Sequence, residues 1–148
     1  MALRFSPAVL LFVGLAALAP GLARGDQGVR YQGVRVETLV RSDRSWNGIR
    51  LPALRAEQPE VSILRITVPA GVSLQRHFHP VINAGVLLQG RLRVEADDGA
   101  TKLVEAGDAL IEMVNTVHRG VSIGPDSAVI LVVYVGQKGQ PLTVPVSP

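Results

Sequence analysis

From residue 61 onward, hydrophobic and polar positions form short stretches that are typical of β-strands. Val61–Val68 is rich in β-branched residues and ends at a Pro-Ala-Gly turn. Arg91–Ala96 alternates strictly, with Leu92 and Val94 set between charged side chains, so one face of this strand meets solvent. Val129–Val135 is apolar throughout, so we expect both of its faces to be covered, by the preceding chain or by a second subunit.

Glycine and proline turns separate the other stretches of this kind. The remaining expected strands cover residues 34–40, 74–79, 82–89, 102–105, 109–114 and 118–123. About nine short strands at hairpin spacing, with no helix among them, predict an antiparallel all-β sandwich or barrel.

The first 25 residues have the layout of a secretory signal peptide. Arg4 precedes the uncharged run Ala8–Ala19, and small residues follow before cleavage sites after Ala23 and Gly25. The run is too short for a membrane span, which needs about 20 apolar residues. We therefore expect residues 1–25 to be removed, which leaves a periplasmic or secreted protein with no membrane attachment.

Composition removes several kinds of chemistry. The chain has no cysteine, which excludes disulfides, thiolate metal ligands and a cysteine nucleophile. Removal of residues 1–25 lowers the formal net charge from +3 to +1, and the remaining arginines are scattered, so nucleic acid is not an expected partner. The mature chain then divides into a lead-in segment at 26–60, a barrel at 61–136 and a C-terminal tail at 137–148.

His77, His79 and His118 are the only imidazoles in the chain. His77 and His79 are separated by one residue in an expected strand, so both point to the same face, whereas Phe78 points away. Two imidazoles on one face, joined by a third from a distant strand, have the geometry of a metal site. The alternative is that the three are hydrogen-bonded structural residues. Trp46, the only tryptophan, is expected to be a packing residue rather than a surface for substrate.

The spacing around the first two histidines resembles a known motif. Gly71, His77, His79 and Gly90 follow the pattern G-x5-H-x-H-x3-E-x6-G, the first motif of the cupin family, with Asn83 where the family has glutamate. Every spacing fits the motif, and the acid is the one departure from it.

The third histidine lies in a second, less complete match. The second cupin motif, G-x5-P-x-G-x2-H-x3-N, keeps its first glycine and its histidine at Gly107 and His118. Its proline, glycine and asparagine are replaced by Met113, Asn115 and Ser122. The resemblance covers roughly residues 61–135 and implies a cupin-type double-stranded β-helix, a jelly-roll barrel, with a metal bound inside.

The resemblance also implies a ligand set. His77, His79 and His118 would hold one divalent transition metal, with iron favoured and zinc, manganese, nickel or copper as alternatives. Asn83 in place of glutamate resembles the three-histidine cupin oxygenases, which lack the carboxylate ligand. Asn83 either approaches the metal through its carbonyl oxygen or only hydrogen-bonds the turn after Pro80.

Glu112 interrupts an apolar stretch, ALIEMV, just before the second histidine motif. It either points into the barrel, where it would act as a general base, or lies solvated on the strand. The leading functional hypothesis is a dioxygenase-like metalloenzyme acting on a small organic molecule. A metal-dependent lyase or isomerase and a non-catalytic cupin that binds a metal or a small molecule are the alternatives. Family analogy and the apolar strand at 129–135 predict a homodimer.

Overall fold

The computed structural model describes residue 33 and residues 35–147, so the expected signal peptide at 1–25 lies outside the described residues. The strands are β1 (Pro59–Val68), β2 (His77–Phe78), β3 (Ile82–Gln89), β4 (Arg91–Ala96), β5 (Thr101–Glu105), β6 (Ala109–Ile111), β7 (His118–Ser122), β8 (Ala128–Gln137) and β9 (Val144–Pro145). The described residues contain no helix, and hence none that is long and apolar enough to cross a membrane. The all-β prediction is confirmed.

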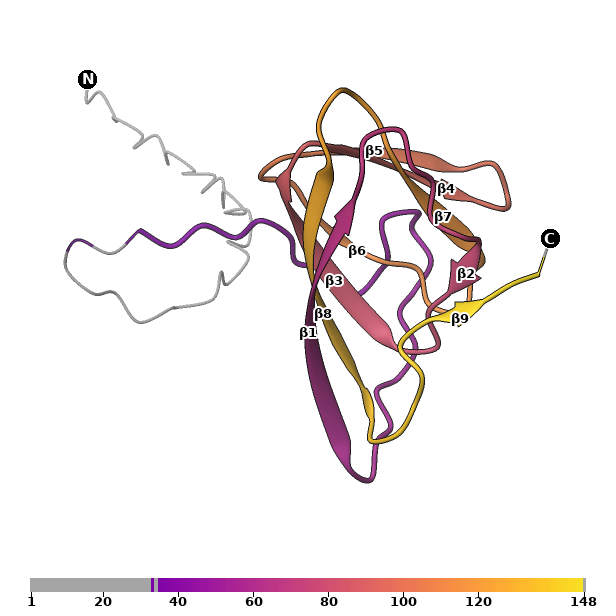
Figure 1. Ribbon diagram of the computed structural model, residues 1–148. Coiled ribbons are helices and arrows are strands. Elements are labelled where there is room, and N and C mark those ends of the chain that lie inside the picture. Colours follow the sequence, from indigo (N-terminus) through magenta and orange to yellow (C-terminus); the bar gives the residue numbers. More distant parts are fainter. Residues whose placement is uncertain (1–32, 34, 148) are drawn as a thin grey trace, which may run out of the picture. The chain divides into compact units, whose positions relative to one another are not determined.

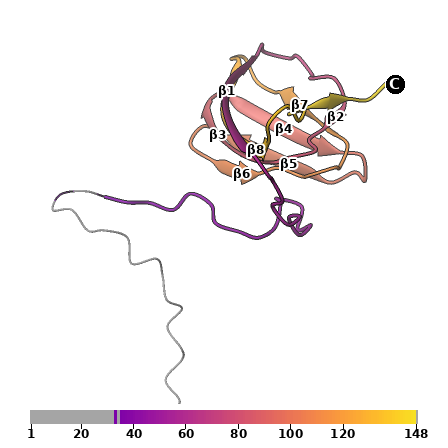
Figure 2. The same ribbon diagram turned by 90° about the horizontal axis from the view of Figure 1, so that it is seen from below.

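The strands form two antiparallel sheets (Figure 1). The first has the order β1-β8-β3-β6, and the second has the order β5-β4-β7-β2-β9. Seen from below, the two sheets curve around a shared interior (Figure 2). Side chains from both sheets meet there, including Leu87, Leu92, Val94 and Val132, and form one hydrophobic core.

Strand β8 shows how the apolar run at 129–135 is used on both faces. Ile130, Val132 and Tyr134 point inward and are at most 5% exposed. Leu131 and Val133 point outward, where they line a shallow depression together with residues 37–40 of the lead-in segment. The preceding chain therefore covers part of the outer face of β8, as one of the two expectations from the sequence had it.

The prediction of a strand at 34–40 is wrong for residues 35–40, the described part of that range. Residues 35–40 form no strand and have no ladder partner, and their hydrophobic side chains Val36, Leu39 and Val40 are exposed. Apolar content alone suggested a strand here, but a strand also needs a neighbour with which to share its backbone hydrogen bonds.

Two other strands are shorter than expected. The range 74–79 contains only β2, flanked by isolated bridges at Ser73 and His79, and the range 109–114 contains only β6. In both places the chain leaves the ladder near the histidines. The Gln75 carbonyl in the first range contacts the His77 ring, and the Thr116 carbonyl, just beyond the second range, contacts the His118 ring.

Candidate metal centre

The structure brings the three predicted histidines together. His77 on β2 is the direct cross-strand partner of His118 on β7, and His79 follows just after β2. Their ring centroids are 4.7 to 5.0 Å apart, and one ring nitrogen from each lies within 4.8 Å of the others. All three side chains are buried. Three imidazoles in the interior are therefore close enough to share one ion.

Hydrogen bonds to the main chain fix the protonation pattern of these rings. The Nδ1 atoms face the carbonyl oxygens of Gln75 (2.7 Å from His77), Leu142 (2.9 Å from His79) and Thr116 (2.7 Å from His118). A carbonyl oxygen only accepts, so each Nδ1 carries the proton and donates. Each Nε2 of the neutral ring then has a free lone pair, which is the form that binds a metal.

The turn before His118 is held by a residue in an unusual backbone conformation. Asn115 has φ +54° and is the only described non-glycine residue with positive φ. Its backbone N–H donates to the carbonyl of His79 at 2.8 Å, which ties the two motifs together. Asparagine tolerates the left-handed region better than other residues with a side chain, which explains how it replaces the glycine of the second motif.

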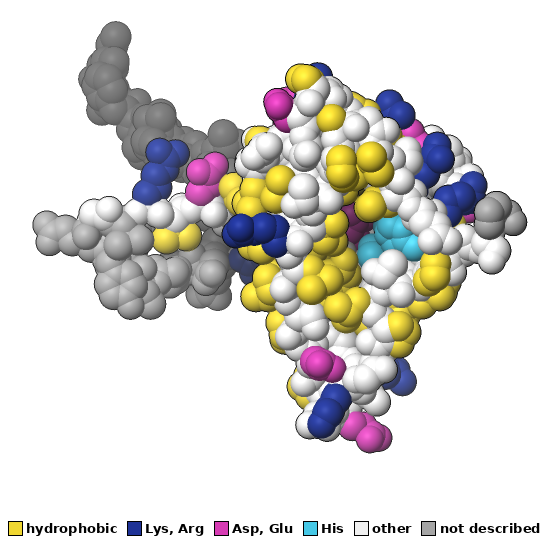
Figure 3. Space-filling view, viewed as in Figure 1, with side chains coloured by type: hydrophobic (Ala, Val, Ile, Leu, Met, Phe, Trp, Pro, Cys, Tyr) yellow, Lys and Arg dark blue, Asp and Glu magenta, His cyan; other side chains and the backbone are white. Residues whose placement is uncertain are grey.

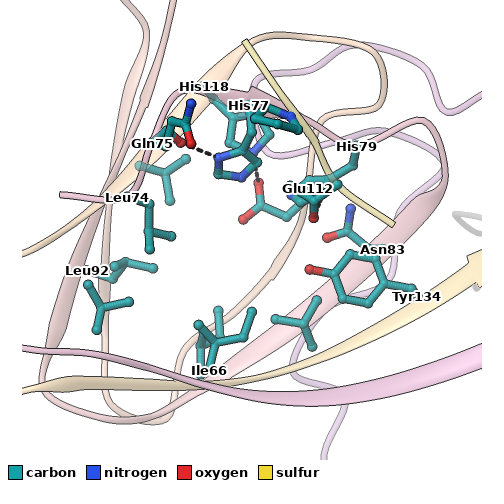
Figure 4. Close-up of a pocket in the computed structure, with 17 residues that line it drawn as sticks. Ile66, Leu74, Gln75, His77, His79, Asn83, Leu92, Glu112, His118 and Tyr134 are labelled. Carbon is teal, nitrogen blue, oxygen red and sulfur yellow. Dashed lines mark hydrogen bonds and ion pairs between the residues drawn. The ribbon is translucent and has the colours of Figure 1, made fainter. Parts of the chain in front are cut away.

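Asn83 and Glu112 both lie beside the histidines. They are neighbours across β3 and the end of β6, because the Glu112 N–H donates to the Asn83 carbonyl at 3.0 Å. Both side chains line the same cavity as the histidines, and Figure 4 shows their oxygen atoms turned into it. Glu112 Oε2 lies 3.8 Å from His118 Nε2. Of the two orientations considered for Glu112, the structure has the one inside the barrel.

Each of these two side chains has a buried oxygen without a hydrogen-bond partner. These atoms are Asn83 Oδ1 and Glu112 Oε2. The Asn83 amide nitrogen donates only a long bond, 3.5 Å, to the Val81 carbonyl. Buried polar atoms without a protein partner are costly, and two of them beside three imidazole nitrogens with free lone pairs form a set of donors that a cation would satisfy. Imidazole with oxygen donors suits a divalent transition metal, so the residues present fit such an ion.

Burial sets the charge state of the site. It lowers the pKa of all three histidines, that of His79 to about 4, so the rings are neutral at neutral pH. Burial raises the pKa of Glu112 to about 7, and the neighbouring His77 and Trp46 side chains oppose part of this rise. Trp46 packs against the core, as expected. Without an ion the site is therefore close to neutral.

The histidines lie at one end of a cavity of about 260 Å³. Figure 3 shows them at the bottom of a hollow, with hydrophobic side chains beside it. Phe78 is not among the lining residues, which agrees with the expected alternation. The rest of the lining is mostly apolar and comes from both sheets: Ile66, Val68, Leu74, Leu92, Val94, Gly120, Ile130 and Val132.

Several residues around the site could not be identified from sequence. Tyr134 lines the cavity, with its ring centroid 5.5 Å from that of His79, and burial raises its pKa. Its inward position in the alternation of β8 was the available signal. Leu142 and Thr143 contact His79 from the C-terminal segment, which β9 attaches to β2. No local pattern indicates this contact, because it depends on pairing between distant parts of the chain.

A sequence profile described as "Cupin domain" matches residues 64–134, about half of the chain. This range contains all three histidines and both of the unpartnered oxygens. The chain is a member of the cupin family. The predicted jelly-roll barrel is confirmed with it. No curated protein matches this cupin in a sequence search.

Solved structures give the same fold at low sequence identity. An oxalate oxidase in complex with the substrate analogue glycolate is 24% identical with a TM-score of 0.51, and covers 58% of this cupin and 46% of its own chain. A DMSP lyase structure is 15% identical with a TM-score of 0.52, and covers 59% and 44%. A Lactobacillus farciminis oxalate decarboxylase in complex with formate is 20% identical with a TM-score of 0.51, and covers 60% and 29%. This cupin therefore spans less than half the length of each of them.

Proposed function

We propose that this cupin is an exported, mononuclear metalloenzyme that acts on a small organic molecule. The observation that carries the proposal is the convergence of three buried Nε2 atoms, each made available by a main-chain carbonyl that holds the opposite ring nitrogen. The ion would be one divalent transition metal, with iron favoured and zinc, manganese, nickel or copper as alternatives.

Different residues of the chain would have different roles at this site. His77, His79 and His118 would hold the ion, and the main-chain carbonyls behind them would keep the rings oriented. Asn83 Oδ1 is a candidate further contact to the ion, because it is buried and has no partner. When bound, the ion would supply Lewis-acid or redox chemistry at positions left open for substrate.

Glu112 is the candidate general base. Its carboxyl faces the cavity, and burial raises its pKa to about 7 in the protein without an ion. A bound cation would favour the ionised form, so the carboxylate would be ready to accept a proton from a substrate beside the metal. The apolar walls around it keep bulk water from competing for that proton.

The reaction proposed first is a dioxygenase-like oxidation, because three neutral ligands leave several coordination positions for substrate and oxygen. A metal-dependent lyase or isomerase is the second candidate, and Glu112 favours it, since such reactions need a proton acceptor beside the metal. Measured oxygen consumption separates the two reactions.

Elemental analysis of untagged protein, purified without chelator, tests the proposal. We expect about one equivalent of metal in the wild type and in Phe78→Leu, whose side chain lies outside the cavity, and none in His77→Ala. Iron together with oxygen uptake on a panel of small molecules would support the dioxygenase. Turnover without oxygen, on zinc, manganese or nickel, would support the lyase or isomerase. Absence of metal under every loading condition would refute the metal site, and metal without turnover would leave a binding protein.

Export and dimerisation belong to the same proposal. Export is supported by the layout of residues 1–25, and mass spectrometry of the natively expressed protein should find this segment removed. A homodimer is supported by the exposed hydrophobic side chains of Val61 and Ile63 on β1, which are 61% and 62% exposed. Light scattering at micromolar concentration should give twice the monomer mass, and a monomer would refute the dimer.

A further inference from the structure

The lead-in segment contains a small turn, residues 43–51, that carries Trp46. Backbone hydrogen bonds close this turn on itself. The Ser45 N–H donates to the Ile49 carbonyl and the Gly48 N–H donates to the Ser45 carbonyl, each at 2.9 Å. Ser45 is buried, and Gly48 has φ +88°, a conformation that glycine adopts without strain. The turn therefore has a defined shape that fixes the position of Trp46.

Trp46 joins this turn to the barrel beside Glu112. Its backbone N–H donates at 2.9 Å to the carbonyl of Ile111, the last residue of β6, and its ring packs against the hydrophobic core. Glu112 is the next residue, and contact with the Trp46 side chain opposes part of the rise that burial causes in its pKa. Glu112 lines the cavity whereas Trp46 does not. The indole therefore approaches the carboxyl from behind the cavity wall.

The two side chains carry complementary atoms that lack partners. Among the residues that the structure describes, three buried side-chain atoms have no hydrogen-bond partner: Trp46 Nε1, Asn83 Oδ1 and Glu112 Oε2. An indole nitrogen only donates and an ionised carboxylate only accepts. Each buried group left unpaired costs stability, so a hydrogen bond between the indole and the carboxylate removes two such costs at once.

We propose that Trp46 is a positioning residue for Glu112, whose carboxylate accepts a hydrogen bond from the indole N–H. Glu112 Oε2 lies 3.8 Å from His118 Nε2, so a cation bound by the histidines would attract the same carboxylate. The indole N–H competes with that attraction and keeps the carboxylate at the cavity wall, free to accept a proton. The inference rests on the proposed function for the ion and the base, whereas the contact itself rests on Trp46 and Glu112 alone.

Nuclear magnetic resonance on metal-free protein at pH 8 tests the contact, because a chain with one tryptophan has one indole N–H signal. A hydrogen bond to a carboxylate should move this signal downfield, and Glu112→Leu should abolish the shift. Glu112→Gln, which keeps an acceptor oxygen, should retain part of it. Glu105→Leu removes an exposed acid at the end of β5 and, as the matched control, should leave the signal unchanged. The same signal in wild type and Glu112→Leu would overturn the inference.

Zinc affinity, measured by competition with a chelator, tests the positioning role. Trp46→Phe keeps an aromatic ring in the core but lacks the N–H. It should raise zinc affinity at least about fivefold, because the carboxylate loses the donor that competes with the ion. In a Glu112→Gln background the same substitution should change zinc affinity by less than about twofold. An unchanged or lower affinity in Trp46→Phe, or an equal rise in both backgrounds, would overturn the inference.

The two measurements also separate this inference from the proposed function. The resonance experiment needs neither an ion nor a folded Trp46 variant. If the chain binds no zinc but the indole signal depends on Glu112, the metal site is refuted and the contact stands. If the chain binds zinc but the indole signal ignores Glu112→Leu, the metal site stands and the inference is overturned. It is also overturned if zinc moves the wild-type signal to its position in Glu112→Leu, because the ion then takes the carboxylate from the indole.

Discussion

The two histidine motifs depart from the family pattern in opposite ways. The segment 71–90 keeps every spacing and both glycines, each at φ +75°, but has lost its acid at Asn83. The segment 107–122 has lost its proline, its second glycine and its asparagine, yet its backbone still makes the turn that presents His118. The first segment kept its geometry and changed its chemistry, whereas the second changed its residues and kept its geometry.

This difference shows which positions are replaceable and by what. Asn115 reproduces a left-handed backbone without being glycine, and Ser122 Oγ accepts the Ala128 N–H at 3.2 Å to tie the β7–β8 turn. The carboxylate that Asn83 lacks is present nearby in Glu112, which follows β6, lies beside Asn83 and lines the same cavity. A backbone role can be taken over by a residue with suitable conformational freedom, and we propose that Glu112 takes over the role of the acid.

The largest expected effect concerns the proposed ligands, of which the first motif supplies two and the second supplies one. His79→Ala in the first segment and His118→Ala in the second should each reduce metal affinity by more than about 100-fold, because each removes one of the three proposed ligands. Competition against a chelator measures this affinity. A large loss in one variant and a small loss in the other would mean that one motif alone holds the ion.

The next effect tests the burial of Glu112 through the pH dependence of the free energy of unfolding of metal-free protein. The unfolded chain ionises Glu112 above about pH 4.5, whereas the folded protein keeps the proton to about pH 7. Burial of Glu112 therefore costs stability that grows between these values and levels off above pH 7. Glu112→Gln should raise the free energy of unfolding by about 3 kcal/mol at pH 8 and have little effect at or below pH 4.5.

Chemical denaturation at the two pH values measures this difference. The histidine contributions are common to both proteins, so they largely cancel in the comparison. A variant that is equally stable to wild type at pH 8 would mean that Glu112 reaches solvent or a partner in the metal-free protein.

A smaller effect is expected for the left-handed turn. Asn115→Ala should destabilise the protein by about 1 to 2 kcal/mol, because alanine pays the cost of positive φ without a compensating side-chain contact. Asn115→Gly, which restores the family residue, should be neutral within about 0.5 kcal/mol. Thermal denaturation measures both, and equal melting temperatures for the alanine and glycine variants would refute the role of backbone strain.

The smallest effect is expected for the β7–β8 turn. Ser122→Ala leaves the buried Ala128 N–H without its acceptor and should cost about 1 kcal/mol. Ser127→Ala, at a half-buried neighbour whose hydroxyl makes no such bond, is the matched control and should change stability by less than about 0.5 kcal/mol. If both variants behave alike, the serine hydroxyl does not replace the asparagine of the motif.

Local periodicity explains what the sequence could predict. The alternation in 91–96, the β-branched run in 61–68 and the one-residue gap between His77 and His79 are local features, and each appears in the structure as expected. The direction of Glu112 stayed open because the residues on both sides of it in ALIEMV are apolar, so no alternation assigns Glu112 to one face. Residues 35–40 looked like a strand because sequence shows apolar content but not the presence of a partner.

Contacts between distant parts of the chain explain what the sequence could not predict. His79 Nδ1 and the Leu142 carbonyl are 63 residues apart, and no property of either local segment points to the other. The apolar lining of the cavity likewise comes from two sheets that meet only in the folded protein. Sequence patterns identified the three histidines. The main-chain carbonyls that orient their rings and the cavity that they line depend on tertiary structure.

The late position of Leu142 also bears on the order in which the protein matures. A chain still being synthesised, or still threading through a translocation channel, has no fixed orientation for the His79 ring until residues 142–145 dock on β2. Capture of the proposed ion by all three histidines would therefore follow completion of the barrel. For an exported chain, the metals available where folding finishes, rather than those at the ribosome, would determine which ion is bound.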